Sequence, residues 1–166
     1  MSSSGSSSGP PERTRSRVRP LVLLDANALL LPFRERFPLR AEIELLCPGA
    51  ELVVPVSVLR ELDSLVERGV REAEPARELA RSFRALPTSG RGDAGIVRAA
   101  VETGAWVATA DRALAGRLAA HGVTVLAPRD RARLEVRPGE VQGSGAQPRR
   151  SGPSPRPRSR ARRGKG

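Results

Sequence analysis

Short, almost wholly apolar runs alternate with amphipathic segments along the middle of this chain. The runs are "LVLL" (21–24), "ELVVP" (51–55), "AWVAT" (105–109) and "VTVLA" (123–127). Runs of this kind are typical of parallel strands that are covered on both faces. Helical spacing or helix-ending residues mark the segments between them, at 26–34, 40–47, 56–69, 74–86, 93–104 and 111–122. The alternation predicts a three-layer α/β/α sandwich around a central, mainly parallel sheet, with 123–127 as its last strand.

Residues 18–137 contain this pattern, and the segments on either side differ from it in composition. Residues 1–17 and 138–166 are rich in Ser, Gly, Pro and Arg and lack apolar periodicity. Such segments cannot bury enough apolar surface to order themselves. We therefore expect one folded domain at 18–137 between two disordered tails.

The net charge of the chain lies almost entirely outside the predicted fold. Between Leu21 and Glu135 there are 16 Arg and 16 acidic residues, while 13 basic and 2 acidic residues elsewhere account for the formal charge of +11. Flexible Arg-rich segments bind nucleic-acid phosphates in a strongly salt-dependent manner. The alternative is a solubilising tail without a specific partner. The C-terminal arginines expected to bind RNA are Arg149, Arg150, Arg156, Arg158, Arg160, Arg162 and Arg163.

Several kinds of chemistry are excluded because the chain has one cysteine, Cys47, and one histidine, His121. A lone cysteine cannot form an intramolecular disulfide, and no zinc site can be assembled from Cys and His. A Ser-His-Asp triad would have to use His121, which precedes a glycine at a predicted helix end, a common structural position. No apolar run approaches the roughly 20 residues of a membrane span, and no signal peptide precedes the core. We expect a cytoplasmic protein whose chemistry depends mainly on carboxylates.

Acidic residues lie where predicted strands lead into helices. Asp25 follows strand 21–24, Asp111 follows strand 105–109, and Asp93 begins helix 93–104. The carboxyl ends of parallel strands meet at one edge of a sheet, where ligands of such folds bind. Each Asp could instead cap its helix. Three acids converging on one edge repel one another unless a cation neutralises them, and hard cations such as Mg²⁺ prefer carboxylate oxygens. The joint pattern favours a metal site.

A fourth acid lies on helix 56–69, but the helical pattern leaves two candidates. The apolar stripe of that helix is centred between Leu62 and Val66. Glu61 lies roughly 100° to one side of the stripe and Asp63 roughly 100° to the other. Periodicity alone does not choose between them.

Four segments, "LLDAN", "VPVSVLREL", "GDAGIVRAA" and "WVATADRAL", occur in an order that resembles the PIN domain, a family of metal-dependent ribonucleases. The resemblance runs from about Leu21 to Leu134 and is strongest to archaeal PIN proteins related to small-subunit rRNA-processing endonucleases. It implies a PIN-like sandwich and selects Glu61 over Asp63. The catalytic and metal-binding residues that it implies are Asp25, Glu61, Asp93 and Asp111, with Asn27 and Thr109 in support.

Two positions depart from the family pattern. Many relatives have an acid directly after the third Asp and an Asn directly before the fourth, where this chain has Ala94 and Ala110. The four acids are retained. The departures bear on the affinity for metal and on the occupancy of a second metal position.

The resemblance implies hydrolysis of RNA phosphodiesters by water activated on one or two Mg²⁺ or Mn²⁺ ions. The function it favours is an endoribonuclease that acts on rRNA or its precursor, with a homodimer as a further candidate assembly and no membrane partner. One alternative is a toxin ribonuclease paired with an antitoxin, although long basic tails are unusual for such compact toxins. The other is a non-catalytic RNA-binding scaffold in ribosome assembly, which the retained acids disfavour and the two alanines mildly favour.

Overall fold

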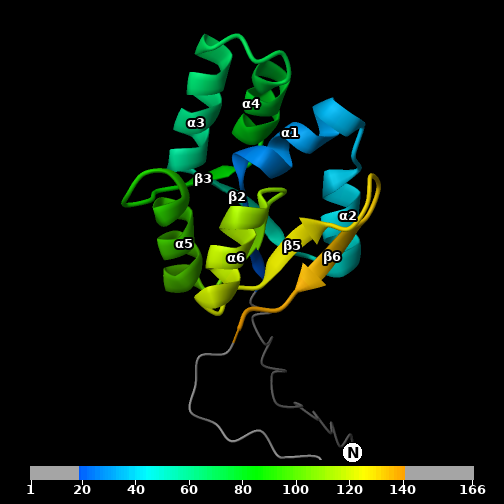
Figure 1. Cartoon of the computed structure of the whole chain (residues 1–166), viewed down its shortest axis with the longest axis vertical. Coiled ribbons are helices and arrows are strands. Elements are labelled where there is room, and N and C mark those ends of the chain that lie inside the picture. The colour runs from blue at the N-terminus through cyan, green and yellow to red at the C-terminus, as the bar shows by residue number, and fades with distance from the viewer. Residues whose placement is uncertain (1–18, 141–166) are drawn as a thin grey trace, which may run out of the picture.

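A computed structural model describes residues 19–140 (Figure 1). Its strand β1 (Leu21–Leu24) lies near the centre of a six-stranded sheet. The strand order is β3-β2-β1-β4-β5-β6. β1 to β5 run parallel, and β6 pairs antiparallel with β5. The predicted α/β sandwich on a mainly parallel sheet is confirmed. The other strands are β2 (Glu51–Pro55), β3 (Arg84–Leu86), β4 (Trp106–Ala108), β5 (Val125–Pro128) and β6 (Leu134–Arg137).

Among residues 19–140, six helices connect the strands and form two groups according to the strands that they follow. The first group follows β1 and β2, and α1 contacts each of its other members. α5 and α6, which follow β3 and β4, contact one another, and α5 also contacts α3. Right-handed crossovers place helices on opposite faces of a sheet when the direction of strand addition reverses. That reversal falls between β1 and β4. The helices are α1 (Ala26–Glu35), α2 (Leu39–Leu46), α3 (Val56–Glu67), α4 (Ala73–Arg81), α5 (Gly92–Thr103) and α6 (Arg112–Ala120).

The core is centred on β1, where Val22, Leu23 and Leu24 are fully buried. Burial on both faces explains why this strand has no alternation of polar and apolar residues. Because both neighbours of β1 are parallel to it, the residues after β1 and β4 emerge side by side at the carboxyl edge of the sheet.

The predicted helix 74–86 is wrong in its second half. α4 ends at Arg81, and Arg84–Leu86 forms β3, which pairs with β2 through Val53 and Arg84. Just after α4, the Ser82 hydroxyl donates to the carbonyl of Leu79. β3 is a short, largely exposed edge strand, so it lacks the apolar run by which the other parallel strands are recognised.

The prediction that 123–127 is the last strand is also wrong. The chain turns after β5 and returns as β6, with Pro128 opposite Leu134. Asp130 Oδ1 holds this turn by accepting from the N–H groups of Ala132 and Arg133, each at 2.9 Å. β6 buries only its first side chain fully, so four residues of sequence carry little strand signal.

The predicted tails 1–17 and 138–166 lie outside the described residues, except for 138–140. There the N–H of Glu140 donates to the carbonyl of Ala119 at 2.8 Å. Among residues 19–140, no helix is long and apolar enough to cross a membrane.

A buried carboxylate, that of Glu42, attaches β6 to α2. Its Oε2 accepts from the N–H of Leu134 at 3.0 Å, and its Oε1 accepts from the Arg133 guanidinium at 3.2 Å. Glu42 is buried although it lies in the first turn of α2. A buried acceptor of this kind satisfies a backbone donor that would otherwise lose its partner.

Replacing Glu42 by Ala is expected to lower the free energy of unfolding by about 1–3 kcal/mol, because the Leu134 N–H is left buried and unpaired. Chemical denaturation followed by circular dichroism measures the change. The control is Glu102→Ala on α5, where the side chain is exposed. An equal, small effect of both substitutions would contradict this account of β6.

Candidate active site at the carboxyl edge of the sheet

Asp25 leaves β1 at the point where the order of strand addition reverses. Its backbone N–H donates to the carbonyl of Ala108, which ties the end of β1 to β4. The residue is only 2% exposed and occupies the N-cap position of α1, yet its side chain makes no capping hydrogen bond. Oδ2 instead accepts from the Thr109 hydroxyl at 2.8 Å. The capping alternative therefore does not explain why a carboxylate is buried here.

Burial raises the pKa of the Asp25 carboxyl above its usual range, and the hydrogen bond from Thr109 partly opposes that rise. Asn27, the predicted supporting residue, makes a weaker polar contact that also favours the ionised form of Asp25. A buried carboxylate with a raised pKa is under electrostatic stress that a nearby cation would relieve.

Thr109 connects Asp25 to Asp111. The hydroxyl is 1% exposed, donates to Asp25 and accepts from the backbone N–H of Asp111 at 3.0 Å. One hydroxyl has one donor and two acceptor positions, so both bonds can form together. Thr109, the predicted supporting residue, thus forms hydrogen bonds with both Asp25 and Asp111.

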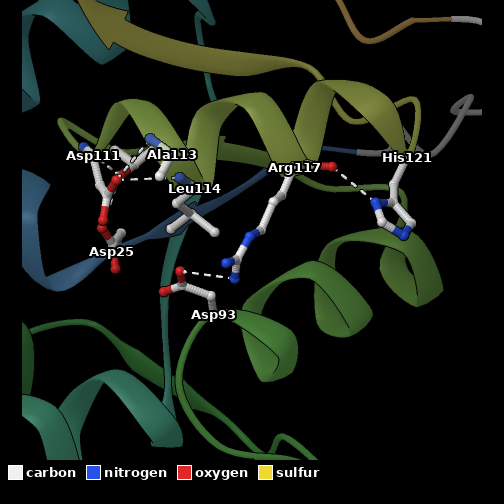
Figure 2. A network of polar contacts seen from close by, with 8 residues as sticks. Asp25, Asp93, Asp111, Ala113, Leu114, Arg117 and His121 are labelled. Atoms are coloured by element: carbon white, nitrogen blue, oxygen red, sulfur yellow. Dashed lines mark hydrogen bonds and ion pairs between the residues drawn. The ribbon is translucent and has the colours of Figure 1, made fainter.

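Asp111 caps α6, as predicted by the alternative in which each Asp caps its helix. Its Oδ1 accepts from the N–H groups of Ala113 and Leu114 at 2.9 and 3.2 Å, as Figure 2 shows. Oδ2 has no hydrogen-bond partner within residues 19–140. In the same view Asp111 lies beside Asp25. One oxygen of Asp111 thus holds the helix, and the other is free for a ligand.

Asp93 is the second residue of α5 and does not cap it, since the N-cap residue is Arg91. Its Oδ2 lies 3.4 Å from Nη1 of Arg117 on α6 (Figure 2). Both side chains are substantially exposed, and ion pairs of this kind contribute little to stability. Arg117 therefore lies at the edge of the site, and its ion pair with Asp93 adds little to the stability of the fold.

Glu61 and Asp63 have different neighbours in the structure. Burial raises the pKa of Glu61, and the charges of Asp25, Asp93 and Asp111 raise it further, while Arg68 opposes them. Asp63 instead forms an ion pair with Arg77 of α4 at 3.3 Å. The second turn of α3 thus directs Glu61 toward the other three acids and Asp63 toward the neighbouring helix.

The loop between β3 and α5 is held against the start of α3. The N–H of Ser57 donates to the Thr88 hydroxyl at 3.4 Å, and Gly95 packs on Gly90. A Cβ atom on Gly95 would lie 3.2 Å from the backbone of Gly90, so a larger residue would have to push Gly90 away by a few tenths of an ångström. These contacts position the first turn of α5 relative to Glu61, one turn beyond Ser57.

The four acids Asp25, Glu61, Asp93 and Asp111 are called the acid cluster below. Within the described residues, only Asp93 has an ion-pair partner. The candidate metal ligands in this cluster are all carboxylate oxygens, which fits a hard cation such as Mg²⁺ or Mn²⁺ rather than zinc. As the side chains stand, however, no group of three or more acids, His or Cys among residues 19–140 is arranged to hold a metal ion.

Sequence reasoning did not identify Arg117 or the buried Ser57 hydroxyl, which has no hydrogen-bond partner among the described residues. Ser57 lies four residues before Glu61, a spacing that shares a helix face and could have drawn attention to it. Arg117 carries no such signal, because its contact with Asp93 joins two helices. His121 ends α6 away from Asp111, with Nδ1 2.8 Å from the carbonyl of Arg117, which matches the structural interpretation of this histidine (Figure 2).

Comparison with known proteins assigns the chain to a family. The family described as "PIN like domain" matches residues 22–131, and this chain belongs to that family. Its fold is similar to the structure of the PIN domain endonuclease Utp24, with 22% identity, a TM-score of 0.60, and coverage of 73% of this chain and 95% of that one. No curated protein matches the chain.

Two archaeal structures are more distant. A PilT N-terminus domain protein from Sulfolobus solfataricus P2 has 11% identity and a TM-score of 0.41, covering 64% of this chain and 86% of that one. A domain of a functionally unknown protein from Methanocaldococcus jannaschii has 17% identity and a TM-score of 0.48, covering 76% and 99%.

The raised pKa of Asp25 predicts a pH dependence of stability in the absence of divalent metal. Between the ordinary and the raised pKa the folded protein binds more protons than the unfolded chain, so this residue's contribution falls as pH rises through that window. We expect metal-free Asp25→Asn to be more stable than wild type at neutral pH by roughly 1–3 kcal/mol.

Thermal unfolding in EDTA across pH measures this effect. The difference should shrink as the pH falls toward about 4 and below, where the unfolded chain also takes up the proton. A wild-type protein that gains stability over the variant as pH rises would contradict the assignment.

Proposed function

We propose that this protein is a metal-dependent endoribonuclease that hydrolyses RNA phosphodiester bonds. The observation that carries the proposal is the acid cluster at the reversal point of a PIN-like sheet. Asp25 is buried without a cationic partner, and Glu61 has three other acids as its neighbouring like charges. A fold gains no stability from such an arrangement, whereas a cation site requires it.

The acid cluster would hold one or two Mg²⁺ or Mn²⁺ ions, which would supply an activated water and offset charge on the leaving oxygen. Thr109 keeps Asp25 in one orientation through its hydroxyl. Asp111 uses Oδ1 for α6, and Oδ2 has no hydrogen-bond partner among the described residues. Arg117 places a positive charge beside Asp93, where it can contact an RNA phosphate.

The choice of rRNA or its precursor as substrate is the finer part of the proposal. It rests on the sequence resemblance to archaeal relatives of rRNA-processing endonucleases. That the similar Utp24 structure is an endonuclease is consistent with it. The Arg-rich segment 138–166, including Arg149 to Arg163, lies almost wholly outside the described residues, and we propose that it adds sequence-independent contacts to phosphates.

One alternative has an observation in its favour. Ala94 and Ala110 supply no ligand, and the described acids do not form a ready-made metal site. A non-catalytic RNA-binding scaffold would show these features. Cleavage and metal binding therefore have to be measured separately.

The full-length protein is expected to cleave structured RNA in Mn²⁺ or Mg²⁺, and Asp25→Asn is expected to be at least about 100-fold slower. Even residues that only support metal ligands typically account for about 10–100-fold. The control is Asp63→Asn, which removes an acid of α3 that pairs with Arg77 of α4 and should keep its activity. A wild type that cuts nothing, or an equally active Asp25→Asn, would refute the nuclease.

Metal binding is tested without any turnover by thermal unfolding in Mn²⁺. At 100 times its dissociation constant, a ligand that binds only the folded state stabilises it by about 2.7 kcal/mol. We expect Glu61→Gln to abolish most of this gain and Asp63→Asn to retain it. Equal gains in both variants would remove Glu61 from the site.

A further inference from the structure

A second feature lies directly beside the acid cluster. A cavity of about 230 Å³ opens at the carboxyl ends of β4 and β5, between α1, α6 and the β5–β6 hairpin. Thr109 and Asp111 form part of its wall. The cavity therefore shares part of its wall with the candidate active site.

The lining of this cavity is mixed, with more polar than apolar surface. Its buried apolar side chains, which are called the apolar floor below, are Leu31, Ala115 and Ala127, and Pro128 lies beside them. No aromatic side chain belongs to the lining. A flat, apolar ligand placed here would contact aliphatic side chains and, at the rim, the planes of arginine guanidinium groups.

Two arginines and a glutamate form the rim. Arg112 is the first residue of α6, and its exposed side chain makes no ion pair or hydrogen bond to any residue that the structure describes. Arg137 is oriented by Glu135, with Nη2 2.7 Å from Oε1. Glu35, at the end of α1, is the acidic member. The rim thus combines cations for phosphate with a carboxylate acceptor.

We propose that this cavity binds the nucleotide next to the scissile phosphate of a single-stranded RNA segment. The base lies on the apolar floor, stacked against a guanidinium plane, and Arg112 and Arg137 contact the neighbouring phosphates. Glu35 can accept a hydrogen bond from an amino group of the base, which would make the cavity sensitive to base identity. This proposal rests on the proposed endoribonuclease function and adds a substrate subsite to it.

RNA fits these observations better than a protein segment does. Two guanidinium groups and the shared wall with the acid cluster suit a ligand whose phosphates run past both places. A peptide could make apolar contacts with the floor, but nothing in a peptide would favour its continuing across four carboxylates. A protein occupant is therefore an outcome that the tests below can reveal.

The first test measures binding of a fluorescent single-stranded 12-nucleotide RNA to the full-length protein in EDTA. Arg112→Ala and Arg137→Ala are each expected to weaken binding about 3–10-fold and to make the slope of log K against log salt shallower by about 0.7 for each lost phosphate contact. The matched control is Arg81→Ala on α4, whose exposed side chain lies outside the cavity lining. Affinity and slope equal to wild type in both cavity variants would overturn the proposal.

The second test locates the bound nucleotide by crosslinking. RNA that carries 4-thiouridine is irradiated with the full-length protein in EDTA and the crosslinked peptides are identified by mass spectrometry. Crosslinks are expected within residues 109–115 and 127–137, and Ala115→Met, which fills the floor, should reduce them at least about threefold in protein whose unfolding temperature is checked. Crosslinks found only elsewhere, or none at all, would overturn the proposal and leave the cavity to a protein partner.

The outcomes separate the two proposals. Both tests exclude divalent metal, so they do not depend on cleavage. Cleaving wild-type protein with unaffected cavity variants would refute only the subsite. Cavity-dependent binding without any cleavage would refute the nuclease and its scissile phosphate, and would leave the cavity as an RNA-binding site.

Discussion

One buried hydroxyl joins the two strands on which the site depends. Thr109 Oγ1 donates to the Asp25 carboxylate after β1 and accepts from the Asp111 N–H after β4, at 2.8 and 3.0 Å. The backbone bond from the Asp25 N–H to the carbonyl of Ala108 runs beside it. These bonds fix the relative positions of two acids, Asp25 and Asp111, that are more than eighty positions apart in the sequence. The other two acids then approach from α3 and α5.

The repulsion among the four acids is unfavourable, and the stability of the surrounding fold offsets it. β1 is fully buried on both faces and cannot shift without opening the core. The loop before α5 is held by close glycine packing, and α6 is capped by one of the acids. Rigid supports of this kind allow like charges to remain together in a folded protein. They also keep the adjacent cavity in a constant place relative to the acids.

Much of the fold could be predicted because buried parallel strands have a distinct pattern. Val22 to Leu24 read as a strand with no other information, and glycines marked helix ends. β3 and β6 could not be predicted in this way, since both are short and mostly exposed at edges of the sheet. For β3, Phe83 follows Leu79 at helical spacing, so local pattern favoured the wrong structure.

For the site, the sequence by itself determined which acids stand at strand ends and that Asp25 leaves an apolar strand. These are local facts about neighbours in the chain. The sequence selected Glu61 over Asp63 only through the family resemblance. The tertiary structure supplied the neighbours, namely the acids whose charges act on Glu61, Arg77 paired with Asp63, and Arg117 beside Asp93. The position of Arg112 and Arg137 at one cavity was likewise decided there. The physical reason is that these contacts join separate elements, and their geometry depends on how the helices pack against a completed sheet.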